Sequence, residues 1–411
     1  MRPGAQALEY LKSEWDNCRF IWNELVSASK DTYLANRDNL IFDKNKVTFG
    51  YADQDKYITY LRSELTDKNG EYWLAKGSSV AQQQIVRDFA TARTKALTDK
   101  ANKKISSTKK RGLPNFKSRL KTLPSMNYTK QGFSLKEVDG RVRLQLPGKI
   151  LIPVVWSREL PSEPSSARVY QDSLGDWYVS FVVEEEFNSL PKSNLAAGID
   201  WGVTQIATVI SMDTETGLEL DANYDLEHSE HGKKAAKELA KYQKQMARRK
   251  TKEQTHGYRL AKFKAARTHK KIQRKREDDA HKWAKRVVTN HSEIAVENFN
   301  PKFLSKTKMA RKASDAAIAK TKSILEWQAL KAGRSLTYHN PAYSTMDCSN
   351  CGERANHRIS LSQRTYVCDK CGLIKNRDKN AALNQLNRAG LNPASVDNVR
   401  LEKHEYAFKA V

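Results

Sequence analysis

Leu195–Ile210 reads Leu-Ala-Ala-Gly-Ile-Asp-Trp-Gly-Val-Thr-Gln-Ile-Ala-Thr-Val-Ile. The run is apolar and rich in β-branched residues, and it follows the polar residues Pro191–Asn194, so it predicts a buried β-strand. Asp200 lies inside this run, flanked by Gly198 and Gly202, which would let another backbone or a ligand come close. Burying an ionised carboxylate is costly unless a cation or a firm partner offsets its charge. A single acid in a strand can have a structural role as readily as a functional one. Its interpretation therefore depends on whether other acids occur next to apolar strands or helices elsewhere in the chain.

The pattern recurs later in the chain. Glu293–Phe299 predicts a second short apolar strand, with Glu297 near its end. Asp378 lies in the first turn of a predicted helix, a position where acids are common because they complement the helix dipole. Taken together, Asp200, Glu297 and Asp378 are hard oxygen ligands suited to Mg²⁺ or Mn²⁺. A pair of such ions can activate water and stabilise the leaving oxygen in phosphodiester cleavage.

The cysteines indicate a second metal site. Cys348 and Cys351 form one pair, Cys368 and Cys371 form another, and a glycine follows each pair. Four thiolates at this spacing predict a tetrahedral Zn²⁺ site with every position filled by protein, so the metal is structural and folds a small ribbon. A redox dithiol is the alternative. Cys18 remains, and we expect it to be a small core residue.

Composition points to a polyanionic partner. The 411 residues carry 72 Lys and Arg against 47 Asp and Glu, a formal net charge of +25, while 39% of the residues are hydrophobic. Such a charge excess in a folded protein favours nucleic acid as the partner. A membrane surface is the alternative, but no run approaches the roughly 18 apolar residues of a spanning helix. The N-terminus also lacks the apolar core of a signal peptide, so we expect a cytoplasmic protein without a membrane partner.

Two basic stretches are candidates for nucleic-acid contact. Lys103–Lys121 combines a basic run with one aromatic residue, and its Gly112 and Pro114 prevent a long helix. The segment is either a solvated loop or a phosphate-contacting segment whose ring stacks on a base. Lys233–Asn290 predicts an antiparallel helical hairpin with basic outer faces, because its residues include a short heptad seam of Tyr258, Ala261, Ala265, Thr268 and Ile272. The predicted nucleic-acid contacts are Lys109, Lys110, Arg111, Phe116, Lys117, Arg87, Lys271 and Arg274.

The remaining periodicities predict the order of elements. Helical spacing dominates up to about Lys104, and alternating residues in Phe133–Glu186 predict short antiparallel strands in a small barrel or sheet. Asp315–Lys331 predicts another amphipathic helix, and Arg334–Tyr338 predicts a short strand before the cysteines.

Several blocks of the sequence resemble one known family. Gly-Ile-Asp-Trp-Gly at 198–202, Ala-Val-Glu-Asn at 295–298 and Arg-Asp-Lys-Asn-Ala-Ala-Leu-Asn at 377–384, with the cysteine pairs before the last block, resemble the TnpB family. These are transposon-encoded relatives of the compact type V CRISPR nucleases. The resemblance extends to Cys18–Leu25 and Arg111–Lys117 and covers most of the chain.

The resemblance implies an α+β multidomain fold. An RNase H-like (RuvC) nuclease domain carries a helical insertion and a zinc ribbon, and a β-barrel wedge domain with an inserted helical recognition domain precedes it. The implied boundaries are 1–125 for the recognition domain with part of the wedge, 126–190 for the wedge strands, 191–340 for the nuclease with the hairpin 233–290, 341–374 for the ribbon, and 375–411 for the end of the nuclease domain and the tail. This chain begins at Met1-Arg-Pro without the family's opening basic strand, so the barrel is either incomplete or closed differently.

The resemblance further implies RNA-guided cleavage of double-stranded DNA next to a short target-adjacent motif, in a prokaryotic cytoplasm. Asp200, Glu297 and Asp378 would be the catalytic, metal-binding acids of a single site, and the paired cysteines would bind zinc. The partners would be a guide RNA and the DNA target, with a monomer per guide expected and a dimer left open. The alternatives are a compact type V CRISPR effector of the same mechanism, a guide-directed repressor that does not cut, and a guide-independent RNase H or resolvase.

Overall fold

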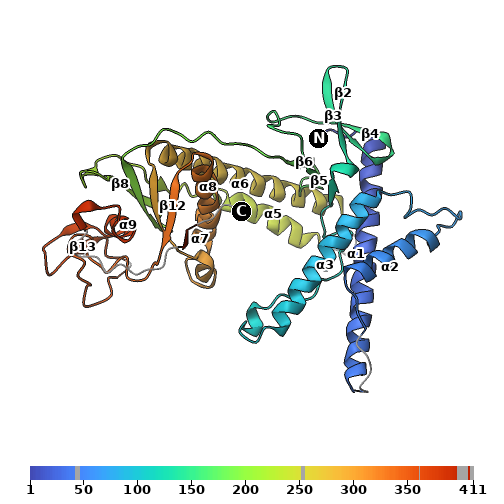
Figure 1. Cartoon of the computed structure of the whole chain (residues 1–411), viewed down its shortest axis with the longest axis horizontal. Coiled ribbons are helices and arrows are strands. Elements are labelled where there is room, and N and C mark those ends of the chain that lie inside the picture. The colour runs from blue at the N-terminus through green and yellow to red at the C-terminus, as the bar shows by residue number, and fades with distance from the viewer. Residues whose placement is uncertain (42–46, 251–254, 361, 396–405, 408–411) are drawn as a thin grey trace. The chain divides into compact units, whose positions relative to one another are not determined.

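The computed structural model describes residues 1–41, 47–250, 255–360, 362–395 and 406–407. The chain divides into two compact units, Met1–Glu185 and Glu186–Val411 (Figure 1). Within the described ranges, no helix is both long and apolar enough to cross a membrane. Residues 251–254 of the predicted hairpin and most of the predicted tail after Ser395 lie outside the described residues.

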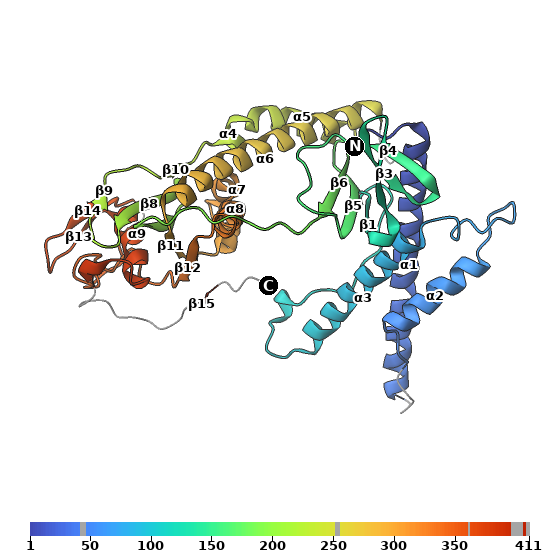
Figure 2. The same cartoon turned by 45° about the horizontal axis from the view of Figure 1, so that its top comes forward.

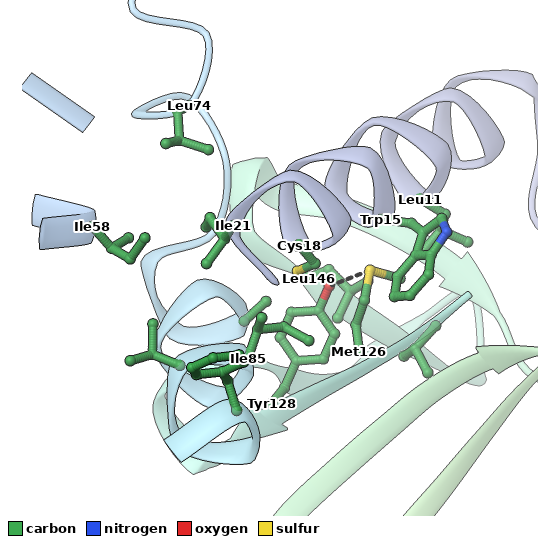
Figure 3. Packing of buried hydrophobic residues seen from close by; sticks show 14 of the residues in the cluster. Leu11, Trp15, Cys18, Ile21, Ile58, Leu74, Ile85, Met126, Tyr128 and Leu146 are labelled. Atoms are coloured by element: carbon green, nitrogen blue, oxygen red, sulfur yellow. Dashed lines mark hydrogen bonds between the residues drawn. The ribbon is translucent and has the colours of Figure 1, made fainter. Parts of the chain in front are cut away.

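Long helices form one part of the first unit. They are α1 (Ala5–Ile41), α2 (Tyr51–Glu64) and α3 (Ser79–Ala101), followed by the short 3₁₀ turn η1 (Ser107–Lys109). Apolar residues of α1 recur every three or four positions and are buried at Leu11, Trp15, Cys18, Ile21 and Leu25, where they pack with Ile85 of α3 (Figure 3). The predicted N-terminal helices are confirmed, as is the prediction of Cys18 as a core residue.

Two separate antiparallel sheets form the rest of the first unit as far as it is described. One has the order β1-β5-β6, with β1 at Ser125–Thr129, β5 at Ser166–Gln171 and β6 at Trp177–Val182. The other has the order β2-β3-β4, with β2 at Ser134–Val138, β3 at Arg141–Leu146 and β4 at Ile150–Pro153. The 3₁₀ turn η2 (Lys130–Gly132) precedes β2, and the 3₁₀ turn η3 (Pro147–Lys149) precedes β4. Asp139 and Gly140 both have positive φ, as the tight β2–β3 hairpin requires. The predicted antiparallel strands are confirmed, and closure of a barrel stays a prediction.

The core of the first unit contains a buried carboxyl group. Glu14 of α1 is 1% exposed, and its Oε2 accepts a hydrogen bond from the backbone N–H of Ser78, 2.8 Å away, at the start of α3. Burial raises the pKa of Glu14 to about 7, although the Ser78 N–H and the Tyr10 hydroxyl favour its ionised form. The carboxyl therefore connects α1 to α3 but is costly to ionise.

We expect Glu14→Gln to stabilise the protein, and to do so more at higher pH. Between the ordinary pKa of 4.5 and about 7, the unfolded chain ionises Glu14 while the folded chain keeps its proton. The free energy of unfolding therefore falls by about 1.4 kcal/mol per pH unit across this window, and the neutral amide escapes this loss. Calorimetry of the full chain should show a gain of up to about 3 kcal/mol near pH 8 and almost none near pH 4.5.

The control for this variant is Glu9→Gln, because Glu9 is an exposed glutamate on the same helix. It should leave the unfolding temperature unchanged at every pH. An equal shift of the Glu14→Gln protein at both ends of the pH window would contradict the assignment.

The described part of the second unit contains a seven-stranded sheet in the order β10-β8-β7-β11-β12-β15, with β9 added beside β8. Its strands are β7 (Leu195–Trp201), β8 (Gln205–Asp213), β9 (Glu219–Leu220), β10 (Leu226–Glu227), β11 (Glu293–Glu297), β12 (Ser335–His339) and β15 (Tyr406–Ala407). The pairs β7–β11 and β11–β12 are parallel, whereas β7–β8 is antiparallel. The strands predicted at 293–299 and 334–338 are confirmed, whereas the single strand predicted at 195–210 is two antiparallel strands connected by Gly202–Thr204.

Helices cover both faces of this sheet (Figure 1). On one face, Ile199 and Val296 pack with α6 (His256–Asn290) and α8 (Ile318–Lys331). On the other face, Ala196 and Ala295 pack with α9 (Arg377–Arg388). Because side chains alternate along a strand, every second residue of β7 and β11 faces α9.

The helical insertion lies between β10 and β11. It contains α4 (His231–Lys234), α5 (Ala236–Arg248) and α6, and Figure 2 shows α5 lying along α6. Of the predicted seam residues, Ala261, Ala265, Thr268 and Ile272 are buried and Tyr258 is half-buried, and α5 packs along α6, which confirms the pairing of the two helices.

The helix predicted at 315–331 is interrupted. Ala317 adopts a left-handed conformation with φ of 51°, so α7 (Ala310–Ala316) ends there and α8 begins at Ile318. The prediction of one continuous helix is therefore wrong at its first residues. The 3₁₀ segments η4 (Pro301–Lys306) and η5 (Pro393–Ser395) and the ribbon strands β13 (Thr365–Val367) and β14 (Ile374–Asn376) complete the unit.

Candidate active site

Two of the predicted acids lie on neighbouring parallel strands. Val296 of β11 pairs with Ile199 of β7, so Glu297 and Asp200 occupy the next positions of the two strands. Both acids face α9 by the alternation described above. Asp200 is 7% exposed and Glu297 is 6% exposed, so the sheet holds two carboxyl groups side by side in a buried position.

The third acid reaches the same face on α9. The side chain of Asn376 caps this helix by accepting hydrogen bonds from the backbone N–H groups of Asp378 and Lys379. Asp378 lies one turn before Ala382, whose carbonyl oxygen would be only 2.2 Å from a Cβ atom at Gly198. Glycine at 198 therefore allows α9 to lie directly on β7, two residues from Asp200.

The electrostatics of the site follow from this crowding. Burial raises the pKa of Asp200 well above its ordinary value, and the charges of Glu297 and Asp378 raise it further. Burial also raises the pKa of Glu297. The carboxyl groups of Asp200 and Glu297 can share a hydrogen bond when one of the two is protonated. Three acids that repel one another in this way form a site whose charge a divalent cation would neutralise.

Two arginines hold the third acid. The guanidinium of Arg377 contacts Asp378 Oδ1 at 3.0 Å, and that of Arg364 contacts Oδ2 at 3.2 Å. Arg364 lies in the ribbon segment just before β13, so the ribbon contributes a residue to the site. We find no local sequence signal that would have identified Arg364, because its partner lies on a separate element.

The ligand atoms of the three acids are spread more widely than those of the four cysteines. The sulfur atoms of the four cysteines all lie within 4.8 Å of one another. Among the residues described, no other group of three or more His, Cys, Asp or Glu side chains brings its ligand atoms this close together. Asp200, Glu297 and Asp378 are not such a group, and Asp378 contacts Arg364 and Arg377. Ligands of two ions about 3.5–4 Å apart need not share one coordination shell. Asp200 and Glu297 could hold one ion in common, with Asp378 completing the second.

The cysteines form a compact cluster. The sulfur atoms of Cys348 and Cys371 are 3.6 Å apart, as are those of Cys351 and Cys368. A tetrahedral zinc ion with Zn–S bonds of about 2.3 Å would place its sulfurs about 3.8 Å apart, so the four thiols fit zinc. Gly352 and Gly372 have φ of 69° and 74°, which explains why a glycine follows each cysteine pair.

We expect Cys368→Ser to release the zinc. A structural zinc site with one thiolate removed loses most of its affinity, so the metal content measured by mass spectrometry should fall from about one zinc per chain to almost none. Amide hydrogen exchange should rise in β13 and β14, which the cluster joins. Cys18→Ala is the control, because Cys18 is buried in the first unit and should not change zinc content. Full zinc content in the Cys368→Ser protein would contradict the site.

The predicted nucleic-acid contacts fall into two groups. Lys109 and Arg87 of the first unit and Lys271 and Arg274 of α6 are exposed. Phe116 is 53% exposed, with the Lys30 ammonium 4.3 Å from its ring centre. Their contact with nucleic acid stays a prediction.

The other members of the basic segment contact their own chain. Arg111 forms a paired contact with Asp99 and lowers the pKa of that acid to about 2. The Lys117 ammonium lies 3.6 Å from the ring centre of Trp22, and burial lowers its pKa. Lys110 Nζ donates a hydrogen bond to the carbonyl of Lys100. These contacts fix the segment on α1 and α3, and a role of its side chains in nucleic-acid binding stays a prediction.

Comparisons with known proteins agree with this architecture. The model of a family described as "Probable transposase" (OrfB_IS605) matches residues 180–308, and that of the "Cas12f1-like, TNB domain" matches residues 319–385. The first match includes β7 and β11, and the second includes the cysteines and the start of α9. The chain is also similar in fold to a solved structure described as the Cas12f1-sgRNA-target DNA complex, with a TM-score of 0.58 and 16% identity over 94% of this chain and 83% of that chain.

Curated relatives extend over more of the sequence. A protein of Streptomyces pristinaespiralis named "Putative RNA-guided DNA endonuclease" is 30% identical over 365 residues, which is 87% of this chain and 84% of that protein. "TnpB-like protein L770" of Acanthamoeba polyphaga mimivirus is 25% identical over 60% of this chain and 48% of its own length. Since the first of these relatives matches nearly the whole chain, and the family models match both the acid-bearing strands and the ribbon, the chain belongs to the TnpB family.

Proposed function

We propose that this protein is an RNA-guided endonuclease that cleaves double-stranded DNA by metal-dependent hydrolysis of phosphodiester bonds at one site. The observation that carries the proposal is the buried pair Asp200 and Glu297, with Asp378 on the same face of the sheet. The proposal is supported by the name of the S. pristinaespiralis relative.

Each residue of the site has a defined task in this proposal. Asp200, Glu297 and Asp378 would hold two Mg²⁺ or Mn²⁺ ions, and ions bound in this way lower the pKa of an attacking water and stabilise the leaving oxygen. Arg364 and Arg377 orient the Asp378 carboxylate through the contacts described above. The four cysteines would bind Zn²⁺ and close the ribbon that carries Arg364.

Guide RNA and target DNA are the partners in this proposal. Base pairing with the guide would select the target, while the protein contacts the backbone and a short adjacent motif. The net charge of +25 and the exposed cations of α6 are suited to these polyanions. The stoichiometry that we propose is one protein per guide.

A guide-directed repressor that does not cut is the second candidate. It needs the same binding surfaces but no acid site. Keeping mutually repelling carboxyl groups buried destabilises the fold, and a protein that only binds DNA gains nothing from that cost. The intact set of acids therefore favours cleavage.

The test starts with the RNA that co-purifies with the full chain. Its sequence defines the guide, and a DNA library with a matching target and randomised flanks then reports cleavage and the adjacent motif together. We expect double-strand breaks only in matched targets, only with Mg²⁺ or Mn²⁺, and none with a chelator. Tight binding of matched DNA without cleavage in Mg²⁺ would contradict the endonuclease and support the repressor.

A further inference from the structure

The segment 340–349 runs from the acid site to Cys348, the first residue of the cysteine cluster. Ser344 in this segment is 3% exposed, and its hydroxyl donates a hydrogen bond to Glu297 Oε1 at 3.3 Å. Cys348, a predicted zinc ligand, follows four residues later in the same segment. A single short stretch of backbone therefore joins the two predicted metal sites.

Helix α9 holds this stretch through buried asparagine side chains. Asn384 Nδ2 donates to the carbonyl oxygens of Ser344 and Asp347, at 2.8 and 2.7 Å. Asn380 Nδ2 donates to the carbonyl of Asp347 at 2.8 Å, and its Oδ1 accepts from the backbone N–H of Ser349 at 3.0 Å. Both asparagines are at most 4% exposed, so these bonds are formed away from solvent and are costly to break.

The ribbon holds the same stretch from its other side. Arg354, which lies between the cysteine pairs, donates to the Asp347 carboxylate at 2.6 Å. The hydroxyl of Tyr366 in β13 donates to the carbonyl of Met346 at 3.2 Å. Closure of the ribbon by its metal would therefore fix the backbone that carries Ser344.

We propose that Ser344 is a positioning residue that couples the zinc ribbon to the acid site. Its hydroxyl fixes the Glu297 carboxylate, and the ribbon metal fixes Ser344, so loss of zinc weakens the binding of divalent cations at the acids. Hydrogen bonds from such outer residues orient metal ligands, and their removal typically costs 10–100-fold in affinity or activity. This inference rests on the proposed function, because it requires that the three acids bind Mg²⁺ or Mn²⁺.

The test measures cation binding directly. Mn²⁺ binding to the full chain is followed by electron paramagnetic resonance, with Asp200→Ala as the blank for the acid site. We expect Ser344→Ala to weaken the Asp200-dependent binding about tenfold or more with zinc content unchanged, and Ser344→Thr, which keeps the hydroxyl, to retain most of it. Ser349→Ala is the matched control, because this buried serine is bound to α9 through its backbone. Equal Mn²⁺ affinity of the wild-type and Ser344→Ala proteins would overturn the proposal.

A double-mutant cycle distinguishes coupling through Ser344 from independent effects of the two substitutions on Mn²⁺ binding. If zinc acts through Ser344, Cys368→Ser alone should weaken Mn²⁺ binding, and adding Ser344→Ala to it should have little further effect. Additive losses would show that the two changes act independently and would overturn the coupling. Mn²⁺ binding is measured without DNA, so this test does not depend on cleavage. If the coupling is found but no guide-matched DNA is cut, the proposed function is wrong and the positioning role of Ser344 is still supported.

Discussion

Asp200→Ala is expected to abolish metal-dependent cleavage while guide RNA remains bound. Asp200 lies where β7, β11 and α9 meet, and its carboxylate would contact the ion that Glu297 also holds. Loss of such a ligand should lower the cleavage rate about a thousandfold or more, because the remaining acids cannot hold the ion in place. Single-turnover cleavage of a guide-matched DNA and filter binding of the guide RNA would measure the two properties separately.

Stability provides an internal check on this variant. Removing one of several buried, mutually repelling carboxyl groups should not lower the unfolding temperature of the metal-free protein, so inactivity cannot be attributed to unfolding. Asp221→Ala is the matched control, because Asp221 is an exposed acid of the same unit and should keep full activity. Cleavage by the Asp200→Ala protein at the wild-type rate would remove Asp200 from the site.

Gly198→Ala is expected to damage the site without changing any acid. The added methyl group would lie 2.2 Å from the Ala382 carbonyl and 2.8 Å from the Leu386 side chain, so α9 must move away from β7. Overpacking of this kind costs about 1–3 kcal/mol or more. A displacement of about 1 Å at Asp378 costs roughly a hundredfold in rate. Thermal unfolding and single-turnover cleavage should therefore both show the defect.

The control for this effect is Gly112→Ala, because a Cβ atom at Gly112 would have no neighbour within 4 Å. It should leave both the unfolding temperature and the cleavage rate near the wild-type values. A Gly198→Ala protein that is as stable and active as the control would mean that α9 does not lie on β7 as described.

The elements that carry the site could be predicted because their signals are local. A carboxylate inside an apolar run indicated Asp200 as a candidate ligand, and the spacing of Cys348 and Cys351 predicted a turn that could bind a metal ion. The long hairpin followed from the repeat of Ala261, Ala265 and Thr268 along one helix face. Each of these signals can be read within a few residues of sequence.

The residues that support the acids could not be predicted in the same way. The Ser344 hydroxyl contacts an acid that precedes it by 47 residues, and the Asn384 side chain reaches back 40 residues to the Ser344 carbonyl. No periodicity encodes contacts at such separations. The recurrence of Asn380, Asn384 and Asn387 at spacings of three and four along one helix was a usable signal, because buried amides require partners. The helix break at Ala317 had no comparable signal, since alanine rarely adopts a left-handed conformation.

The late position of α9 in the chain has a consequence for synthesis. A ribosome delivers β7 and β11 well before Arg377, so the sheet can begin to form while α9 is still being made. Until that helix docks over Gly198, a nascent polypeptide holds only two of the three acids. If the three acids form the catalytic centre as proposed, a translation product that stops before Arg377 would lack Asp378 and would not cleave DNA.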